Sequence, residues 1–295
     1  MICQNDILAS DSLKTKGLVA PDTGKPVHKL ALDSTKTKKM NVGQDIVNDA
    51  VIFAEDGASY FTIPFRLPPS GWLWTAGIIG GTFGLMAADK EFKGLVSGEG
   101  RTTYNHDILD GPTAYGFVQY PSIAAGTLYL TGLFARNDWM RVTARLWMEG
   151  LAYSGITVMG MRYITGRARP SNTDDAWKYT WFNPKGDTES FPSGHTVVAF
   201  ATSTVLAERI DSWWARAILY SAAALTGYTR MRNDQHWLSD IFVGALLGFG
   251  SGYFVVHREK ERYTEATEDK KGNKGGEKGF SIYPSFNGVR FVYRF

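Results

Sequence analysis

Arginines, histidines, one serine and one aspartate gather in three short stretches of an otherwise apolar region, and side chains of these types can transfer a phosphoryl group. Guanidinium groups match phosphate oxygens in bidentate pairs and offset the charge that spreads over them in the transition state. One histidine can attack phosphorus while a second protonates the leaving oxygen. The candidate residues are Arg162, Arg169, Ser193, Gly194, His195, Arg230, His236 and Asp240.

The first stretch runs from Arg162 to Pro170 and contains two of the arginines. Arg162 and Arg169 are seven residues apart, which is two turns along one face if a helix continues that far. Pro170 marks the exit from that helix. The two guanidinium groups can then converge on one anion. A solvated or lipid-interfacial cationic helix end is the alternative interpretation.

The second stretch opens a helix with a serine, a glycine and a histidine. Backbone N–H groups at a helix start, together with the Ser193 hydroxyl and the positive end of the helix dipole, form a site for an anion. His195 in the first turn can face the same anion. The alternative is an ordinary serine N-cap beside an incidental histidine. The stretch reads Phe191-Pro192-Ser193-Gly194-His195-Thr196.

The third stretch places His236 four residues before Asp240, at the start of a further helix. On a helix, this spacing lets the carboxylate accept the imidazole N–H, which leaves the other ring nitrogen free to attack. A helical surface pair is the alternative, and the nearby Arg230 argues against it.

Six apolar segments must position these residues, and they predict an all-α protein with a six-helix core. The first has no charged residue over 22 positions, which is long enough to span a bilayer. Several others are shorter or contain Gln, Pro and Ser, so both an integral membrane bundle and a soluble bundle remain open. The segments are Leu67–Ala88, Gly111–Ala135, about Leu146–Met161, Thr196–Ala207, Ala217–Tyr228 and Ile241–Val256.

Around this core, composition predicts a division into four parts. Residues 1–66 are polar and lack a sustained helical period, so we expect an extended or partly disordered lead-in before the helical domain at 67–257. Residues 258–279 are charged and then rich in Gly and Lys, as in a solvated linker. Residues 280–295 flank Asn287-Gly288, and apolar residues alternate with other residues in the second half. This pattern predicts a terminal β-hairpin.

Charge and cysteine content exclude several classes of protein. The 32 Lys and Arg against 29 Asp and Glu leave a formal charge of +3, too nearly neutral to favour nucleic acid as a partner. The single cysteine, Cys3, allows neither an intrachain disulfide nor a cysteine-based metal cluster. The first ten residues show no signal peptide, so either a signal peptide is absent or this chain starts after it.

The three stretches resemble the motif triplet of the type 2 phosphatidic acid phosphatase and vanadium haloperoxidase superfamily. That pattern is Lys-x6-Arg-Pro, then Pro-Ser-Gly-His, then Ser-Arg-x5-His-x3-Asp, and its order and internal spacing agree over roughly Leu67 to Val256. Arg162 stands in place of the lysine and keeps the charge with a different donor geometry. Thr229 stands in place of the first serine and keeps the hydroxyl.

The resemblance implies a role for each candidate residue and a six-helix core. His236 attacks phosphorus to form a phosphohistidine, and Asp240 holds the imidazole ring. His195 is the general acid for the leaving oxygen and then the base for water. Neither a metal nor another cofactor is required. The phosphoryl oxygens are bound by Arg162, Arg169, Ser193, Gly194 and Arg230.

The expected function is therefore metal-independent hydrolysis of a phosphate monoester or pyrophosphate, with a phosphorylated lipid as the favoured substrate and its head group left open. Alternatives are a soluble periplasmic acid phosphatase for small esters, a vanadium-dependent haloperoxidase and a non-catalytic binding protein. We expect a bacterial-type envelope protein, either integral to the inner membrane with its site facing the periplasm or soluble in the periplasm. The membrane orientation follows from the positive-inside rule and Arg136, Arg141, Arg145, Arg209, Arg216, Arg258, Lys260 and Arg262.

Overall fold

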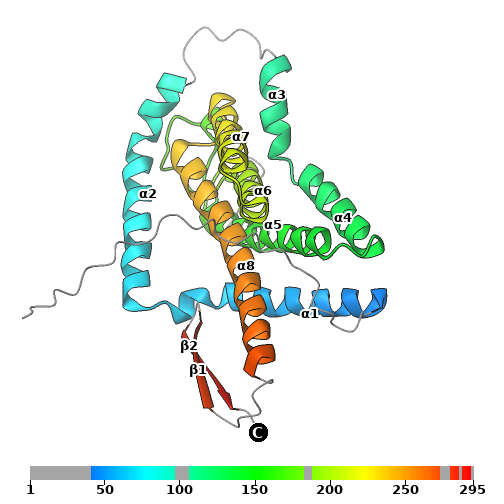
Figure 1. Cartoon of the computed structure of the whole chain (residues 1–295). Helices are drawn as coiled ribbons and strands as arrows, with labels where there is room; N and C mark the ends of the chain where they lie inside the picture. The colour runs from blue at the N-terminus through cyan, green and yellow to red at the C-terminus, as the bar shows by residue number, and fades with distance from the viewer. Residues whose placement is uncertain (1–40, 97–105, 183–187, 273–279, 286–287, 294–295) are drawn as a thin grey trace, which may run out of the picture. The chain divides into compact units, whose positions relative to one another are not determined.

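The computed structural model describes residues 41–96, 106–182, 188–272, 280–285 and 288–293, so the predicted lead-in over 1–40 lies outside the described residues. The described part is helical apart from two short strands, which confirms the all-α class (Figure 1). Its elements are α1 (Val42–Phe61), η1 (Ile63–Arg66), α2 (Pro69–Val96), α3 (His106–Tyr115), α4 (Gln119–Phe134), α5 (Asp138–Thr165), η2 (Pro170–Asn172), α6 (Gly194–Ile210), α7 (Trp213–Arg232), α8 (Leu238–Gly272), β1 (Phe280–Ser285) and β2 (Gly288–Tyr293).

The expected count of six helices is wrong, since eight α-helices occur in the residues described. One of the two differences is a division of the predicted segment Gly111–Ala135 into α3 and α4. Pro121 lies in the first turn of α4 and has no backbone N–H. In a continuous helix its ring would clash with the carbonyl of Phe117, four residues earlier. The chain therefore breaks between Tyr115 and Gln119.

The second difference is α1, which occupies residues predicted to be extended. Its N-terminus is closed by a capping box in which Asn41 and Gln44 each accept the other's backbone N–H, at 2.9 and 3.1 Å. Its buried residues are acidic: Asp49 accepts from Arg141 at 2.7 Å, and Asp56 accepts from Arg262 at 2.7 Å. Ion pairs attach this helix together with the rings of Phe53 and Tyr60, which pack on Tyr153 of α5 with centroids 5.3 and 5.5 Å apart. The expectation that these residues are extended was therefore wrong.

The predicted linker also differs, because α8 continues through it to Gly272. Its charged run packs on neighbouring helices: Glu259 accepts from Arg145 of α5 at 2.6 Å, and Arg258 lies 3.6 Å from Asp56 of α1. The strands β1 and β2 pair antiparallel from Phe280 opposite Tyr293 to Ser285 opposite Gly288. Asn287, on which the predicted turn rested, lies outside the described residues.

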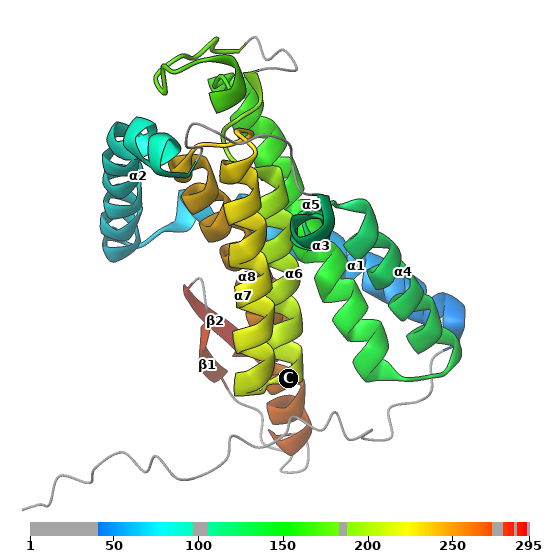
Figure 2. The same cartoon turned by 90° about the horizontal axis from the view of Figure 1, so that it is seen from above.

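The helix α6 is the centre of the bundle and packs most extensively on α8, with α5 and α7 as its other main neighbours (Figures 1 and 2). Glycines let α6 and α8 approach closely. A Cβ at Gly248 would collide with the Val197 carbonyl oxygen and come within 2.8 Å of the Phe200 Cβ. The main core cluster on α5, α6 and α8 contains Val142, Leu146, Trp147, Leu151, Tyr153, Ala201, Val205, Phe254, Val255 and Val256.

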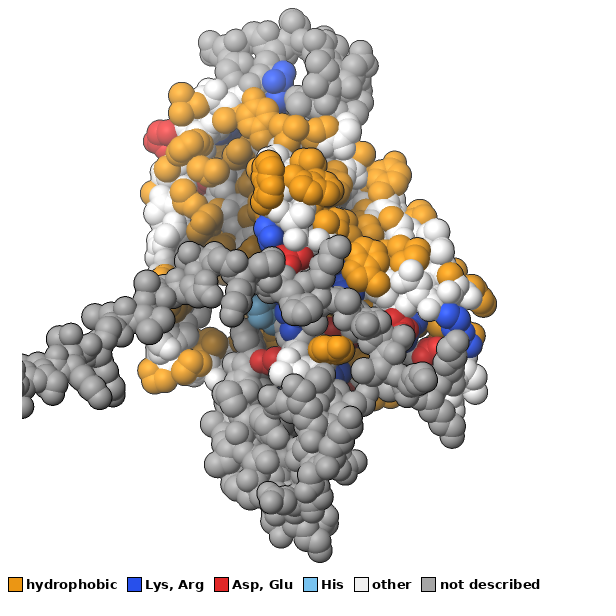
Figure 3. Space-filling view, in the orientation of Figure 1, with side chains coloured by type: hydrophobic (Ala, Val, Ile, Leu, Met, Phe, Trp, Pro, Cys, Tyr) orange, Lys and Arg blue, Asp and Glu red, His pale blue; other side chains and the backbone are white. Residues whose placement is uncertain are grey.

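Large apolar side chains are also exposed, and Figure 3 shows hydrophobic groups across much of the described surface on one face. Within the described residues, one helical segment, Leu238–Glu265, is long and apolar enough to cross a membrane, and 56% of its most apolar window is buried inside the protein. A buried core helix meets the same criterion. Exposed examples are Trp72, Leu73, Trp74 and Ile79 on α2, and Ile123, Leu130 and Phe134 on α4.

We predict that Gly248→Ala lowers the free energy of unfolding by about 1–3 kcal/mol, because the new methyl group must push α8 away from α6. Gly250→Ala is the matched control on the same helix: it has no atom within 4 Å of the new Cβ and should stabilise by up to about 1 kcal/mol through helix propensity. Thermal or denaturant unfolding of the two variants checks this. Equal effects of the two substitutions would contradict the close approach.

Candidate active site

The helix directions bring the three polar stretches to one end of the bundle, where α5 and α7 end and α6 and α8 begin. The predicted residues meet there, since the charges of Arg162, Arg169, Arg230 and His236 all act on the His195 ring. Arg162 and Arg230 lie in the last turns of α5 and α7, Arg169 precedes η2, Ser193 caps α6, Gly194 and His195 begin α6, His236 precedes α8 and Asp240 lies in the first turn of α8.

His236 is held by a backbone carbonyl that the sequence analysis missed. Its side chain is buried, with only 3% of the residue exposed, and its Nδ1 lies 2.7 Å from the Ser190 carbonyl oxygen. Because a carbonyl oxygen can only accept, Nδ1 carries the proton and Nε2 keeps a lone pair. The predicted acceptor, Asp240, is farther away, with Oδ2 at 3.7 Å from Nδ1. The expected direct Asp240 hydrogen bond is therefore replaced by one to Ser190.

Asp240 is fully buried and fixed by three donors. Arg167 Nη1 donates to Oδ1 at 2.6 Å, while the Ser190 hydroxyl and the Trp237 N–H, at 2.8 Å, donate to Oδ2. Trp237 directly follows His236, so the carboxylate holds the backbone next to that histidine. Arg167 and Ser190 were not predicted. Arg167 lies between the two arginines of the first stretch, which is the only sequence signal for it.

The phosphate-binding candidates are tethered to the loops around them. Arg162 donates from Nε and Nη2 to the Pro192 carbonyl at 3.3 and 3.2 Å, and its guanidinium lies against Gly194. Arg169 Nη1 donates to Gln235 Oε1 at 2.8 Å. Ser193 is buried, and its hydroxyl oxygen accepts from the Thr196 hydroxyl at 2.9 Å. These contacts hold two cations beside the N-terminus of α6.

The Nε2 atom of His195 is buried and makes no hydrogen bond to the described residues. Its ring packs edge-on against Phe117, with centroids 4.8 Å apart. Burial, followed by the charge of Arg230, lowers the pKa of His195 to about 3. Burial likewise lowers the pKa of His236, against the opposing effect of Asp240. Both imidazoles are therefore neutral near pH 7.

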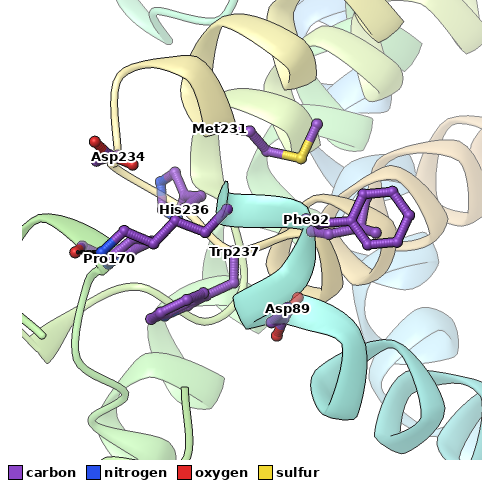
Figure 4. A pocket seen from close by; sticks show the side chains of 9 residues that line it. Asp89, Phe92, Pro170, Met231, Asp234, His236 and Trp237 are labelled. Carbon is purple, nitrogen blue, oxygen red and sulfur yellow. Dashed lines mark hydrogen bonds between the residues drawn. The ribbon is translucent and has the colours of Figure 1, made fainter. Parts of the chain in front are cut away.

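A small pocket next to His236 is lined in part by residues of α2, so this helix borders the site (Figure 4). Its volume is about 10 Å³, which is the size of a single water molecule. Among the described residues, no group of three or more His, Cys, Asp or Glu side chains could hold a metal ion. The pocket is lined by Asp89, Phe92, Lys93, Pro170, Met231, Asp234, His236, Trp237 and Leu238.

The arrangement has the parts required for phosphoryl transfer. Three guanidinium groups and a helix N-terminus can bind the oxygens of a phosphate. A neutral His236 has a lone pair for attack on phosphorus. His195 has an unoccupied ring nitrogen that can exchange a proton with the leaving group.

Comparison with known proteins agrees with this geometry. The sequence model of the PAP2 superfamily matches residues 144–263, which confirms the resemblance and covers α5 to most of α8. A lipid A 1-phosphatase from Porphyromonas gingivalis is 36% identical over 101 residues, which are 34% of this chain and 20% of that protein. A lipid A 4'-phosphatase from Bacteroides thetaiotaomicron is 27% identical over 113 residues, which are 36% of this chain and 50% of that protein.

Two solved structures are similar as well. The crystal structure of Aquifex aeolicus LpxE has a TM-score of 0.40 and 22% identity, covering 57% of this chain and 94% of that one. The transmembrane PAP2-type phosphatidylglycerolphosphate phosphatase from Bacillus subtilis has a TM-score of 0.45 and 14% identity, covering 73% of this chain and 96% of that one. The matched parts of the two lipid A phosphatases are a fifth and half of their lengths.

We predict that inorganic phosphate raises the pKa of His195, because its negative charge offsets the arginines, which together with burial lower that pKa. In the free protein the ring should stay neutral down to about pH 5, since its pKa is about 3. NMR titration of protein with labelled histidine, with His195→Asn to assign the signal, measures both states. A ring already protonated at about pH 6 without phosphate would contradict the prediction.

Proposed function

We propose, from the PAP2 superfamily domain that residues 144–263 form, that this chain is a phosphatase that removes a phosphate group from a lipid through a phosphohistidine. The observation that carries the proposal is the state of His236. Its Nδ1 proton is directed to the Ser190 carbonyl, and its pKa is lowered by burial. A neutral, oriented imidazole beside three arginines is a nucleophile for a phosphorylated substrate.

In the first half of the reaction, Arg162, Arg169 and Arg230 bind the non-bridging oxygens together with the Ser193 hydroxyl and the Gly194 N–H. His236 Nε2 attacks phosphorus, and the bond from phosphorus to the leaving oxygen breaks with its electron pair on oxygen. Protonated His195 donates its Nε2 proton to that oxygen. The products are the dephosphorylated lipid and a phosphohistidine.

In the second half, neutral His195 takes a proton from water as the water oxygen attacks phosphorus. The bond between phosphorus and His236 Nε2 breaks, which releases inorganic phosphate and restores the free imidazole. Because the pKa of His195 in the free protein is low, its ring is neutral and has a lone pair that can accept this proton. The bound phosphate supplies the negative charge that makes the acid role possible in the first half.

A phosphorylated lipid, and lipid A in particular, is the substrate that we propose. The curated relatives are named lipid A 1-phosphatase and lipid A 4'-phosphatase. Exposed aromatic rings near the site also favour an amphiphilic substrate: Trp181 stacks on Tyr179 with centroids 5.0 Å apart, and Trp177 stacks on Phe83 at 6.3 Å. Trp and Tyr are enriched where a protein meets the polar surface of a membrane.

We further propose a bacterial envelope location, with the protein in the inner membrane and the site facing the periplasm. The apolar segment Leu238–Glu265 and the exposed apolar residues of α2 and α4 support contact with lipid. The loop at Arg136 and the charged end of α8 are at the opposite end of the helices from His236, which agrees with the positive-inside rule.

We expect the purified full chain to release phosphate from a lipid in the presence of a chelator, and His236→Ala to abolish this turnover. The panel of substrates to be compared contains lipid A 1- and 4'-phosphates, phosphatidic acid, phosphatidylglycerol phosphate, undecaprenyl pyrophosphate and a water-soluble phosphate ester. Orthovanadate should inhibit competitively. Loss of activity on chelation would contradict the metal-free mechanism, and preference for the soluble ester would favour a periplasmic acid phosphatase.

We also predict that Arg162→Lys keeps kcat/KM within about tenfold, because the superfamily pattern has lysine here and a lysine retains the positive charge. Arg162→Gln, the matched neutral variant, should lose about 100-fold or more, as expected for removal of a group that stabilises transition-state charge. Steady-state kinetics on the preferred substrate distinguish the two. Equal losses in both variants would show that the fork of the guanidinium, rather than its charge, is required.

A further inference from the structure

Arg167 is fully buried and joins two buried carboxylates from different parts of the chain. Its Nη1 donates to Asp240 Oδ1 at 2.6 Å and its Nη2 to Asp89 Oδ2 at 2.7 Å. Nε and Nη2 also donate to the Ala176 carbonyl at 3.0 and 2.8 Å. The guanidinium lies 5.8 and 5.6 Å from the ring centroids of Tyr179 and Trp237. Its position is therefore fixed on every side by contacts.

Asp89 belongs to α2, outside the segment that matches the PAP2 superfamily. It accepts the Ser239 backbone N–H at 2.9 Å and the Ser239 hydroxyl at 2.6 Å, and that hydroxyl accepts from Arg167 Nη1 at 2.7 Å. Ser239 directly precedes Asp240. Asp89 thus holds both the arginine that binds Asp240 and the backbone beside it. Figure 4 shows Asp89 on α2 near the segment that carries His236 and Trp237.

The cost of burying these charges indicates a role beyond attachment. Two carboxylates and one guanidinium can be buried only if they are paired and hydrogen-bonded to one another. Replacing such a set of charges by apolar residues often leaves the protein equally stable or makes it more stable. Here the set touches the candidate site directly. Asp240 lies 3.7 Å from the His236 Nδ1 and accepts the N–H of the next residue. Arg167 pairs with the Oδ1 of this carboxylate, while the Nδ1 proton of His236 is directed to the Ser190 carbonyl.

We propose that Arg167, anchored by Asp89 of α2, is a positioning residue that sets the orientation and effective charge of Asp240 and through it the reactivity of His236. The inference rests on the proposed phosphatase function. It adds α2 to the catalytic domain as a functional part, because α2 supplies the second carboxylate. Arg167 itself touches no substrate and acts only through Asp240.

The experiment measures kcat and KM of the full chain with the lipid phosphate that the wild type prefers. Arg167→Gln and Asp89→Asn should each lower kcat by about 10- to 100-fold, as loss of groups that orient a functional side chain does elsewhere, and leave KM within about threefold. Arg167→Lys should restore part of the loss, since an ammonium group can pair with one carboxylate. Unfolding curves establish that each variant is folded.

Arg145→Gln is the matched control at the other end of the bundle. Arg145 is nearly as buried as Arg167 and also joins carboxylates of different helices: Glu149 and Glu259 at 2.8 and 2.6 Å, and Asp49 at 3.4 Å. It has no contact with the site. This variant should lower the unfolding temperature and keep kcat. It separates the general cost of a broken buried ion pair from a loss of reactivity.

The pH profile gives a readout that a purely structural role would not change. The ionisable groups that face His236 are Arg162, His195, Arg230 and Asp240 at the site, and Asp89, Lys93 and Asp234 in the adjacent pocket. Removing Arg167 strengthens the field of Asp240, raises the pKa of His236 and moves the acid limb of kcat/KM to higher pH. Asp89→Asn frees Arg167 to neutralise Asp240 more fully, so the same limb should move to lower pH.

We expect a lower kcat in both variants, with the acid limb of kcat/KM at higher pH in Arg167→Gln and at lower pH in Asp89→Asn. Full kcat in folded Arg167→Gln and Asp89→Asn, with turnover intact in the wild type, would overturn this inference and leave the proposed function in place. A wild type without turnover on the whole panel would overturn both. If Arg167→Gln does not fold, Arg167→Lys and Asp89→Asn decide by the same two measurements.

Discussion

The close approach of α6 to α8 is the constraint on which the site depends. A Cβ at Gly244 would lie 2.8 Å from the Ser193 carbonyl oxygen, and the Ser193 N–H donates to the Asp240 carbonyl at 3.1 Å. The N-terminus of α6 is therefore locked to the first turn of α8. Because the start of α6 offers N–H donors for an anion and His236 directly precedes α8, this contact sets the distance between the proposed phosphate site and the proposed nucleophile.

Charge is distributed differently at the two ends of the bundle. At the α1 end, Arg141, Arg145 and Arg262 are paired with the acidic residues of α1, α5 and α8, so the cations there attach one helix to another. At the site end, Arg162 donates to the Pro192 carbonyl and lies 3.8 Å from the carboxylate of Glu189, and Arg169 donates to the side-chain oxygen of Gln235. Burial, followed by the charges of the arginines, keeps the His195 ring neutral. In the proposed function, an anionic substrate offsets those charges.

The helical body could be predicted where apolar residues recur with the helical period, as in α5 to α7 and the first half of α8. The prediction failed where another interaction decided the structure. Asp49 and Asp56 attach α1 through ion pairs, and Glu259 extends α8 in the same way. A single proline, Pro121, divides the segment that forms α3 and α4. None of these effects appears in a hydrophobic pattern.

The sequence by itself determined which side chains could do the chemistry, because the two histidines, Asp240 and the three arginines lie at or next to the ends of the predicted apolar segments. Tertiary structure alone decided how they are held. The acceptor of the His236 Nδ1 proton is the Ser190 carbonyl, and every residue carries a carbonyl, so no sequence pattern marks this one. Asp89 reaches Arg167 across 78 positions, a contact that exists only because α2 packs beside α8.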